Sequence, residues 1–211
     1  MMTRTRTIIM PEWAGKAVEE EQGGWPVIKF FEPSADGFQA GLADLSHRPK
    51  AIVQGQGLQG RGRLNPGAVY WTGKAFVCGL KPEEAVVFDL KGPVEPAWPD
   101  EYHTDMTEGW VLLALWGARS LEIMQRLVAV DIERPEARDP FYLVTRSHGL
   151  ALQVLNPKGP EPGFFLACER SHGQNLFDTC IHAGEQFALK PAGEADFKKW
   201  FEKHMFLINV Q

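Results

Sequence analysis

The sequence has only three cysteines, no long apolar run and no excess of basic residues. Cys78, Cys168 and Cys180 lie far apart, form no Cys-x-x-Cys pair and are odd in number. This pattern argues against a disulfide framework and is typical of a reducing compartment. We therefore expect a cytoplasmic protein in which each cysteine is a small, buried apolar side chain.

Charge and hydropathy exclude two further classes. The 211 residues carry a formal net charge of −5 and their basic residues are scattered, so the electrostatic signature of nucleic-acid binding is missing. No apolar run approaches the roughly 20 residues that a membrane-spanning helix needs. The apolar run before Pro11 is too short for the core of a signal peptide. We expect neither a nucleic-acid partner nor a membrane segment.

Common catalytic and metal-binding motifs are absent as well. The six histidines show no His-x-His, His-Glu-x-x-His or His-x-Cys spacing. Ser46 and His47 are neighbours, and neighbours along a strand point to opposite faces, so the two cannot form a nucleophile–base pair. We predict no metal site and no catalytic residue, and we interpret His47 as structural.

A glycine-rich segment at 55–60 has the Gly-x-Gly-x-x-Gly spacing of dinucleotide-binding proteins. That motif requires a helix to begin at once, so that its N-terminal amides meet a pyrophosphate. Gly62 and Pro66 follow too closely for such a helix, and no second strand carries a carboxylate at the expected distance. The segment is better interpreted as a turn after a strand.

What the sequence does contain is a loose internal repeat. Residues 44–46 (Asp-Leu-Ser) and 105–107 (Asp-Met-Thr) share one pattern, and each is followed by an apolar strand that runs to a glycine, Gly55 or Gly117. A fixed order at a fixed offset indicates one supersecondary unit used twice. Two copies are too few for a solenoid, so we expect two related halves packed into one body.

Local patterns place the expected elements. In the first half we predict a short helix at 37–43 and strands near 50–54, 68–78 and 85–90. In the second half we predict a strand at 110–116, a helix after Gly117, strands near 141–145, 149–155 and 163–169, a helix that Ser171 caps, and a helix near 194–204. The alternation predicts an α+β fold of two similar antiparallel sheet-and-helix modules.

The predicted helices each have an apolar face at helical spacing. These faces comprise Leu121, Met124, Leu127 and Val128; then Leu176, Phe177, Cys180, Ile181 and Gly184; and finally Phe197, Trp200, Phe201 and His204.

We divide the chain into three parts. Residues 1–35 are expected to be an extended N-terminal arm that orders against a partner, 36–99 the first module, and 100–211 the second module with the C-terminal helices. The connector is placed where Pro93, Pro96 and Pro99 crowd one segment.

Aromatic residues gather in four places along the chain. These are Tyr70-Trp71, Trp110, Trp116 and Phe164-Phe165. Such rings could sandwich a flat heterocycle such as a pterin, although large rings usually build the core.

Four stretches together resemble a known family. They are ADLSHRPKAIVQG at 43–55, GLKPEE at 79–84, TDMTEGWVLLALWGARSLEIMQRLVAVDI at 104–132 and FFLACERS at 164–171. In this order they resemble the gamma subunit of heterotetrameric sarcosine oxidase. More broadly, they are similar to the superfamily of the glycine cleavage T-protein, a folate-dependent aminomethyltransferase. The resemblance implies an α+β fold of two similar modules, related to the folate-binding T-protein core.

The functional residues of that superfamily carry over poorly. The resemblance implies a carboxylate in the stretch LNPGAVY at 64–70, which has no acid. It also implies a Glu two residues before a Gly-aromatic pair, facing the pterin, and Glu161 before Gly163-Phe164 has that spacing. Glu161, Tyr70 and Trp71 are therefore the candidate residues for binding tetrahydrofolate.

The resemblance and the missing acid together lead to a functional hypothesis. We expect a non-catalytic folate-superfamily subunit or partner of a flavin-dependent amine oxidase or demethylase in one-carbon metabolism. Its partner would be a larger flavoprotein subunit, or it would form a homo-oligomer. The alternative is a stand-alone tetrahydrofolate-dependent aminomethyltransferase, and an α+β domain with an unrelated ligand also stays open.

Overall fold

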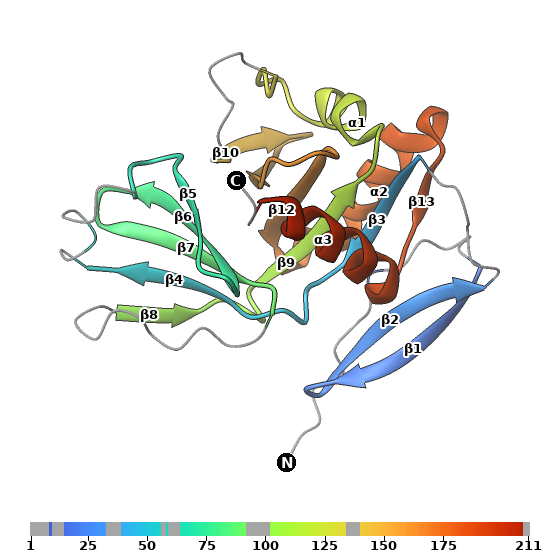
Figure 1. The fold of residues 1–211 in the computed structure, drawn as a ribbon, viewed down its shortest axis with the longest axis horizontal. Coiled ribbons are helices and arrows are strands. Elements are labelled where there is room, and N and C mark those ends of the chain that lie inside the picture. Colours follow the sequence, from blue (N-terminus) through green and yellow to red (C-terminus); the bar gives the residue numbers. More distant parts are fainter. Residues whose placement is uncertain are drawn as a thin grey trace.

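The structure is a computed structural model that describes residue 9 and residues 15–32, 39–55, 58, 64–91, 102–133 and 140–208, with side chains up to Lys203. Figure 1 shows these parts of the chain as three sheets and three α-helices. The strands are β1 (Lys16–Gln22), β2 (Trp25–Glu32), β3 (Ala40–Asp44), β4 (Lys50–Gln54), β5 (Val69–Trp71), β6 (Ala75–Lys81), β7 (Glu84–Asp89), β8 (Tyr102–Asp105), β9 (Trp110–Trp116), β10 (Phe141–Ser147), β11 (Leu150–Asn156), β12 (Gly163–Glu169) and β13 (Leu189–Pro191). The helices are α1 (Ser120–Leu127), α2 (Gly173–Gly184) and α3 (Glu194–Ile208).

The two larger sheets repeat one strand order. The six-stranded sheet runs β10-β11-β12-β9-β3-β13, and the five-stranded sheet runs β5-β6-β7-β4-β8. Four strands of each sheet therefore match, β10-β11-β12-β9 against β5-β6-β7-β4, and all of these neighbours are antiparallel. The predicted α+β fold of two similar antiparallel modules is confirmed.

The modules exchange one strand each. β3 comes directly before β4 in sequence but pairs with β9 in the other sheet. Likewise, β8 comes directly before β9 but pairs with β4. The repeated Asp-x-Ser and Asp-x-Thr motifs lie at these two crossings, so the repeat in the sequence marks the places where the chain passes between sheets.

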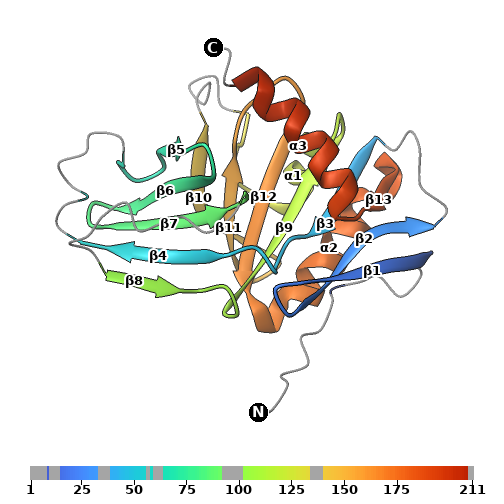
Figure 2. The ribbon, with the colours of Figure 1, turned by 60° about the horizontal axis from the view of Figure 1, so that its bottom comes forward.

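The six-stranded sheet is covered on both faces. β9 is buried along nearly its whole length, and its alternate residues point to opposite faces. Val111, Leu113 and Leu115 join α1 and α2 in one apolar cluster, whereas Leu112 and Ala114 face α3 and the five-stranded sheet. Figure 2 shows α3 lying across this second face, opposite α1 and α2.

A separate hairpin precedes the modules. β1 and β2 pair antiparallel through a turn at Gly23 and Gly24, and β2 packs against α3. Trp25 is buried, and the guanidinium carbon of Arg170 lies over its ring, 4.6 Å from the ring centroid. These two strands were not predicted within the expected arm. The proposed boundaries near 35 and 99 stay predictions, because both fall within or beside residues outside the described ranges.

Most of the other predicted elements are confirmed, with three corrections. The helix at 37–43 is wrong, because residues 40–44 form β3, which is held by pairing with β9 and β13. Ser171 does not cap α2: it lies in a 3-10 turn, and α2 begins at Gly173 without a side-chain cap. The strand at 68–78 is two strands, β5 and β6, because Thr72 and Gly73 form a turn.

The helical faces agree with their prediction at most positions. Met124 and Leu127 of α1, all five predicted residues of α2, and Phe197, Trp200 and Phe201 of α3 are buried. Leu121 is only partly buried, and Val128 is buried but follows α1 in an extended conformation. The side chain of His204 lies outside the described residues, as do the connector prolines and most of the glycine-rich segment at 55–60. Within the described ranges, the longest apolar helix falls short of what a bilayer crossing requires.

Candidate functional site

The centre of the molecule is the pair of strand crossings, which are held by reciprocal hydrogen bonds. The Ser46 Oγ accepts a bond from the Leu112 amide at 3.1 Å, and the Thr107 Oγ1 accepts one from the Lys50 amide at 3.1 Å. Each hydroxyl residue is positioned by the aspartate two residues earlier, whose carboxylate accepts the Ser46 or the Thr107 amide at 2.8 Å. The hydroxyl residues of the repeat therefore join the modules rather than act as nucleophiles.

Asp44 is the more deeply buried aspartate of the two crossings. Burial raises the pKa of its carboxyl group, and hydrogen bonds from Ser46 oppose that rise. Its second oxygen, Oδ2, lies 3.5 Å from the amide of Ile9 and accepts its hydrogen bond. Because both oxygens are engaged by the chain itself, Asp44 is a structural acceptor.

Lys50 is a buried cation beside this crossing. It is 2% exposed, and its Nζ donates to the carbonyl oxygens of Ser46 and Arg48, both at 2.8 Å. Burial lowers the pKa of its ammonium group to about 7. The negative charges of Asp44 and Asp105 act in the opposite direction but do not outweigh burial. A lysine with a pKa near neutrality can act as a base. Here, however, two main-chain acceptors hold the nitrogen inside its own turn.

A second polar group lies at the start of α3. Glu194 is 1% exposed, and its Oε1 accepts a charge-assisted hydrogen bond from the Nη2 of Arg48. The His47 Nε2 lies 3.6 Å from the other carboxylate oxygen, beyond hydrogen-bond reach. Burial, together with the nearby Arg48 and Lys50, lowers the pKa of His47 to about 3. Neutral His47 therefore adds no charge, and its burial agrees with a structural role.

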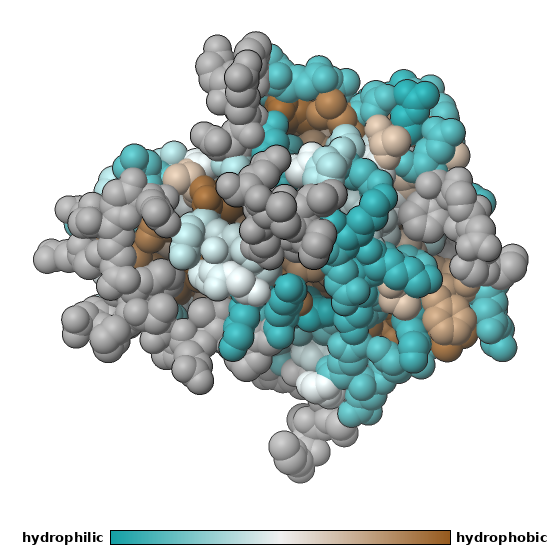
Figure 3. Space-filling view, viewed as in Figure 1, coloured by the Kyte–Doolittle hydropathy of each residue, from teal (hydrophilic) through white to brown (hydrophobic). Residues whose placement is uncertain are grey.

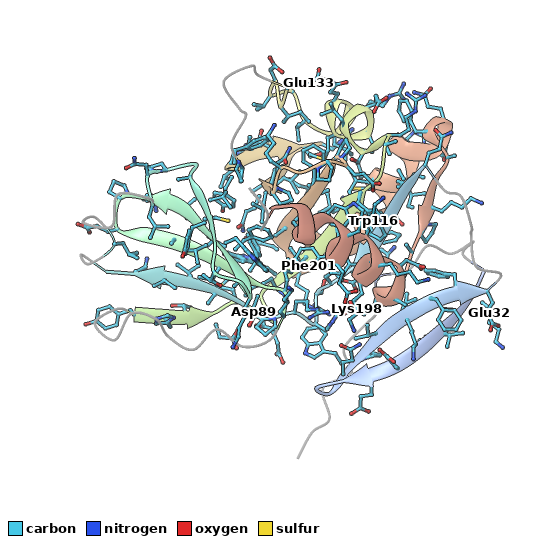
Figure 4. The ribbon with its side chains drawn as sticks, viewed as in Figure 1. Glu32, Asp89, Trp116, Glu133, Lys198 and Phe201 are labelled. Carbon is cyan, nitrogen blue, oxygen red and sulfur yellow. The ribbon has the colours of Figure 1, made fainter. Side chains whose placement is uncertain are left out.

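Aromatic side chains of α3 fill the space between the two large sheets. Phe197 and Phe201 stack with ring centroids 5.3 Å apart, and Trp200 stacks on Trp116 of β9 at 5.9 Å. Phe165 of β12 contacts Phe197, Trp200 and Phe201 at centroid distances of 6.0–6.5 Å. We call these five residues the aromatic centre. Figure 4 labels Trp116 and Phe201 in this region.

Tyr70 and Trp71, two of the predicted cofactor-binding residues, point to opposite faces of β5. Trp71 packs toward the aromatic centre, 4.6 Å from Phe76 and 5.9 Å from Phe201. Tyr70 is 41% exposed and pairs with Val77, whose side chain belongs to the apolar cluster on the other face of the sheet. The two rings therefore cannot form opposing walls of one pocket.

Glu161, the third predicted residue, lies in the loop between β11 and β12. Its Oε1 accepts a 2.7 Å hydrogen bond from the Nζ of Lys203, and its side chain is 42% exposed. Glu161 and Trp71 thus both lie against the last described turns of α3, through Lys203 and Phe201 respectively. The three predicted residues do not line one site that fits a folate.

Two buried charged residues, Lys50 and Glu194, were not singled out from the sequence. A lysine at the start of a strand and a glutamate in the first turn of a helix are ordinary surface patterns. The available signal was the proximity of Lys50 to the repeated motif.

The three cysteines are buried and unpaired. In the ranges that the structure describes, no three His, Cys, Asp or Glu side chains are placed to hold a metal ion.

Comparison with known proteins supports the fold. No family model matches the chain, and no curated protein matches it. Among solved structures, it is similar to a chain of heterotetrameric sarcosine oxidase from Corynebacterium sp. U-96, determined in complex with pyrrole 2-carboxylate. The TM-score is 0.60 at 14% sequence identity, and the match covers 73% of this chain and 88% of that chain. At this identity the similarity establishes a shared fold.

Proposed function

We propose that this chain is a non-catalytic subunit of a flavin-dependent amine oxidase or demethylase complex in one-carbon metabolism. In this complex a larger subunit would carry the flavin and the reacting amine. The observation that carries the proposal is the filled space between the two modules. There α3 places aromatic rings against Trp116 and Phe165, where a cofactor-binding subunit would need room for its ligand.

The polar groups of the strand crossings support a structural role. Main-chain atoms of the crossings are the hydrogen-bond partners of three polar side chains, Ser46, Lys50 and Thr107. A catalytic acid or base has to reach its substrate within hydrogen-bond distance. Each of these side chains is instead occupied inside the fold.

The fold comparison supports membership in a complex. The structural neighbour is a chain of a heterotetramer, and 88% of that chain is matched. The likeness therefore extends over nearly a whole subunit of that assembly rather than over one domain of a larger subunit. We extend the same kind of role to this chain as part of the proposal.

Purification from native cells tests the proposal directly. The tagged full-length chain should elute with a larger polypeptide at fixed stoichiometry, and the complex should show flavin absorption and oxidise an N-methylated amine. An unrelated protein with the same tag serves as the control. A chain that elutes alone, or with a companion that lacks flavin, would contradict the proposal.

Calorimetric titration with a reduced folate tests the alternative of a stand-alone aminomethyltransferase. We expect no binding heat, since Tyr70, Trp71 and Glu161 do not line a common site. Binding in the micromolar range that Glu161→Gln abolishes, and that the matched variant Glu202→Gln leaves intact, would favour the transferase and overturn the non-catalytic role.

A further inference from the structure

Glu194 connects α3 to both large sheets. Its carboxylate accepts from Arg48, and the Nη1 of the same arginine donates to the Leu90 carbonyl at 2.7 Å, at the end of β7. Lys198, one helical turn further along α3, lies 3.4 Å from the same Glu194 oxygen. One buried carboxylate thus holds the start of the helix against the crossing and the five-stranded sheet.

The β1–β2 hairpin meets α3 at the same place. Gly193, the residue before Glu194, lies directly on the backbone of β2, since an added Cβ would come within 2.2 Å of the Lys29 carbonyl oxygen. Glu20 of β1 pairs with Lys29 at 3.2 Å, and Lys198 also helps to lower the pKa of Glu20. Figure 4 shows Lys198 on the side of α3 that faces the hairpin.

The outer end of α3 is held more weakly. There Lys203 pairs with the half-exposed Glu161, and such solvent-exposed pairs contribute little to stability. In Figure 3 the outward face of α3 is hydrophilic. The side chains of Lys198, Lys199 and Lys203 are half to largely exposed. The helix is therefore an amphipathic cover whose strongest polar attachment is at Glu194.

This attachment is electrostatically incomplete. The His47 Nε2, the Arg48 Nε and the Glu194 Oε2 are buried and make no hydrogen bond within the described residues. Buried polar atoms without partners carry a desolvation cost. If α3 moves away, water can hydrogen bond to these three atoms and the desolvation cost is removed. This gain offsets part of the free energy that is lost when the apolar contacts of α3 open.

We propose that Glu194 is the lock of a two-part lid, in which the β1–β2 hairpin and α3 close together over Trp116 and Phe165 and open together. The closed state is the one described here, in which Phe197, Trp200 and Phe201 fill the space between the sheets. Release of Glu194 frees the hairpin, because Gly193 lies against the Lys29 backbone and α3 packs on β2, and it exposes the rings of Trp116 and Phe165.

Hydrogen exchange of the full-length chain tests the lid with a matched pair of variants. Glu194→Gln should raise exchange in residues 16–32 and 194–203 together, by roughly a hundredfold, because it leaves Arg48 buried without its charged partner. Strands β9 to β12 should keep their protection. The control Glu161→Gln should change only the outer end of α3, by about fivefold at most. A hydrophobic dye should bind to the Glu194→Gln variant and not to the Glu161→Gln control.

Gly193→Ala tests the same lid by disturbing the contact between α3 and the hairpin, and it leaves every charge in place. Its methyl group pushes the Lys29 backbone away, so exchange should rise in α3 as well as in the hairpin. If the hairpin and α3 respond separately in either variant, the two are not one lid. Equal loss of protection in all strands in both variants would also overturn the proposal, because α3 would then be an inseparable part of the core.

Discussion

Ser46 and Thr107 hold equivalent places in the two modules, and each hydroxyl accepts a main-chain amide from the other module at 3.1 Å. Ser46 binds the amide of Leu112 in β9, and Thr107 binds that of Lys50 in β4. Because the bonds are reciprocal, each copy of the repeated motif holds its module to the other one at a crossing. Its hydroxyls therefore contribute to stability, and their removal can be measured.

Replacement of the buried hydroxyl should be the more costly of the two. Ser46→Ala leaves the buried Leu112 amide without an acceptor, so we expect it to lower the free energy of unfolding by about 1–3 kcal/mol. Thr107→Val should cost less, because its site is half-buried and water can replace the hydroxyl. Urea unfolding measures both. Thr179→Ala, which removes an exposed helical hydroxyl, is the control and should change little.

Stability should rise with pH because of Lys50. Burial lowers its pKa to about 7 in the folded chain from the ordinary 10.5, so between about pH 7 and pH 9 the unfolded state binds more protons than the folded state. The free energy of unfolding therefore increases across this window, which ends where thiols begin to ionise. Unfolding by urea at a series of pH values should show the slope.

The slope should disappear in Lys50→Met and persist in Lys199→Met, whose side chain is exposed. If the Lys50→Met variant keeps the full increase of unfolding free energy with pH, a group other than Lys50 causes that increase.

The aromatic centre should be sensitive to one methyl group. An added Cβ at Gly163 would lie 2.3 Å from the Trp200 ring, so Gly163→Ala should overpack the centre and cost about 1–3 kcal/mol. A smaller side chain opposite it, Trp200→Leu, should absorb part of that cost. Thermal unfolding of both single variants and the double variant checks this, and strict additivity of the two losses would contradict direct packing.

One substitution should stabilise the chain. Ala188 follows the 3-10 turn after α2 with a φ of 54°, a left-handed conformation in which its Cβ is strained. Ala188→Gly should therefore raise the free energy of unfolding by roughly 0.5–1 kcal/mol. Ala183→Gly inside α2 is the matched control and should lower it, because glycine weakens a helix interior.

The second module is the part of the fold that the sequence predicts best. The apolar run at 110–116 and the helical spacing in α2 are local patterns, and local patterns suffice when they agree with the tertiary contacts. β3 shows the opposite case. The sequence suggests a helix at 37–43, and only the pairing of residues 40–44 with β9, far along the chain, makes them a strand. The β1–β2 hairpin depends in the same way on its contact with α3.

The candidate residues show a similar division. Glu161 and Trp71 were selected by resemblance and by ring chemistry, and both lie near α3, but their partners Lys203 and Phe201 could not be read from spacing. Tyr70 was selected together with Trp71 as rings that could sandwich a pterin, and strand alternation places the two on opposite faces. Burial of Lys50 and Glu194 depends on the crossing of distant strands, which no local pattern reveals.

The strand exchange between modules has a consequence for the history of such a chain. Because β3 completes the sheet of the second module and β8 completes that of the first, neither half retains a whole sheet if the two separate. The duplicated units can drift apart in sequence, and one can lose chemistry that the other keeps. Neither module can become an independent protein without replacing the strand that the other module supplies.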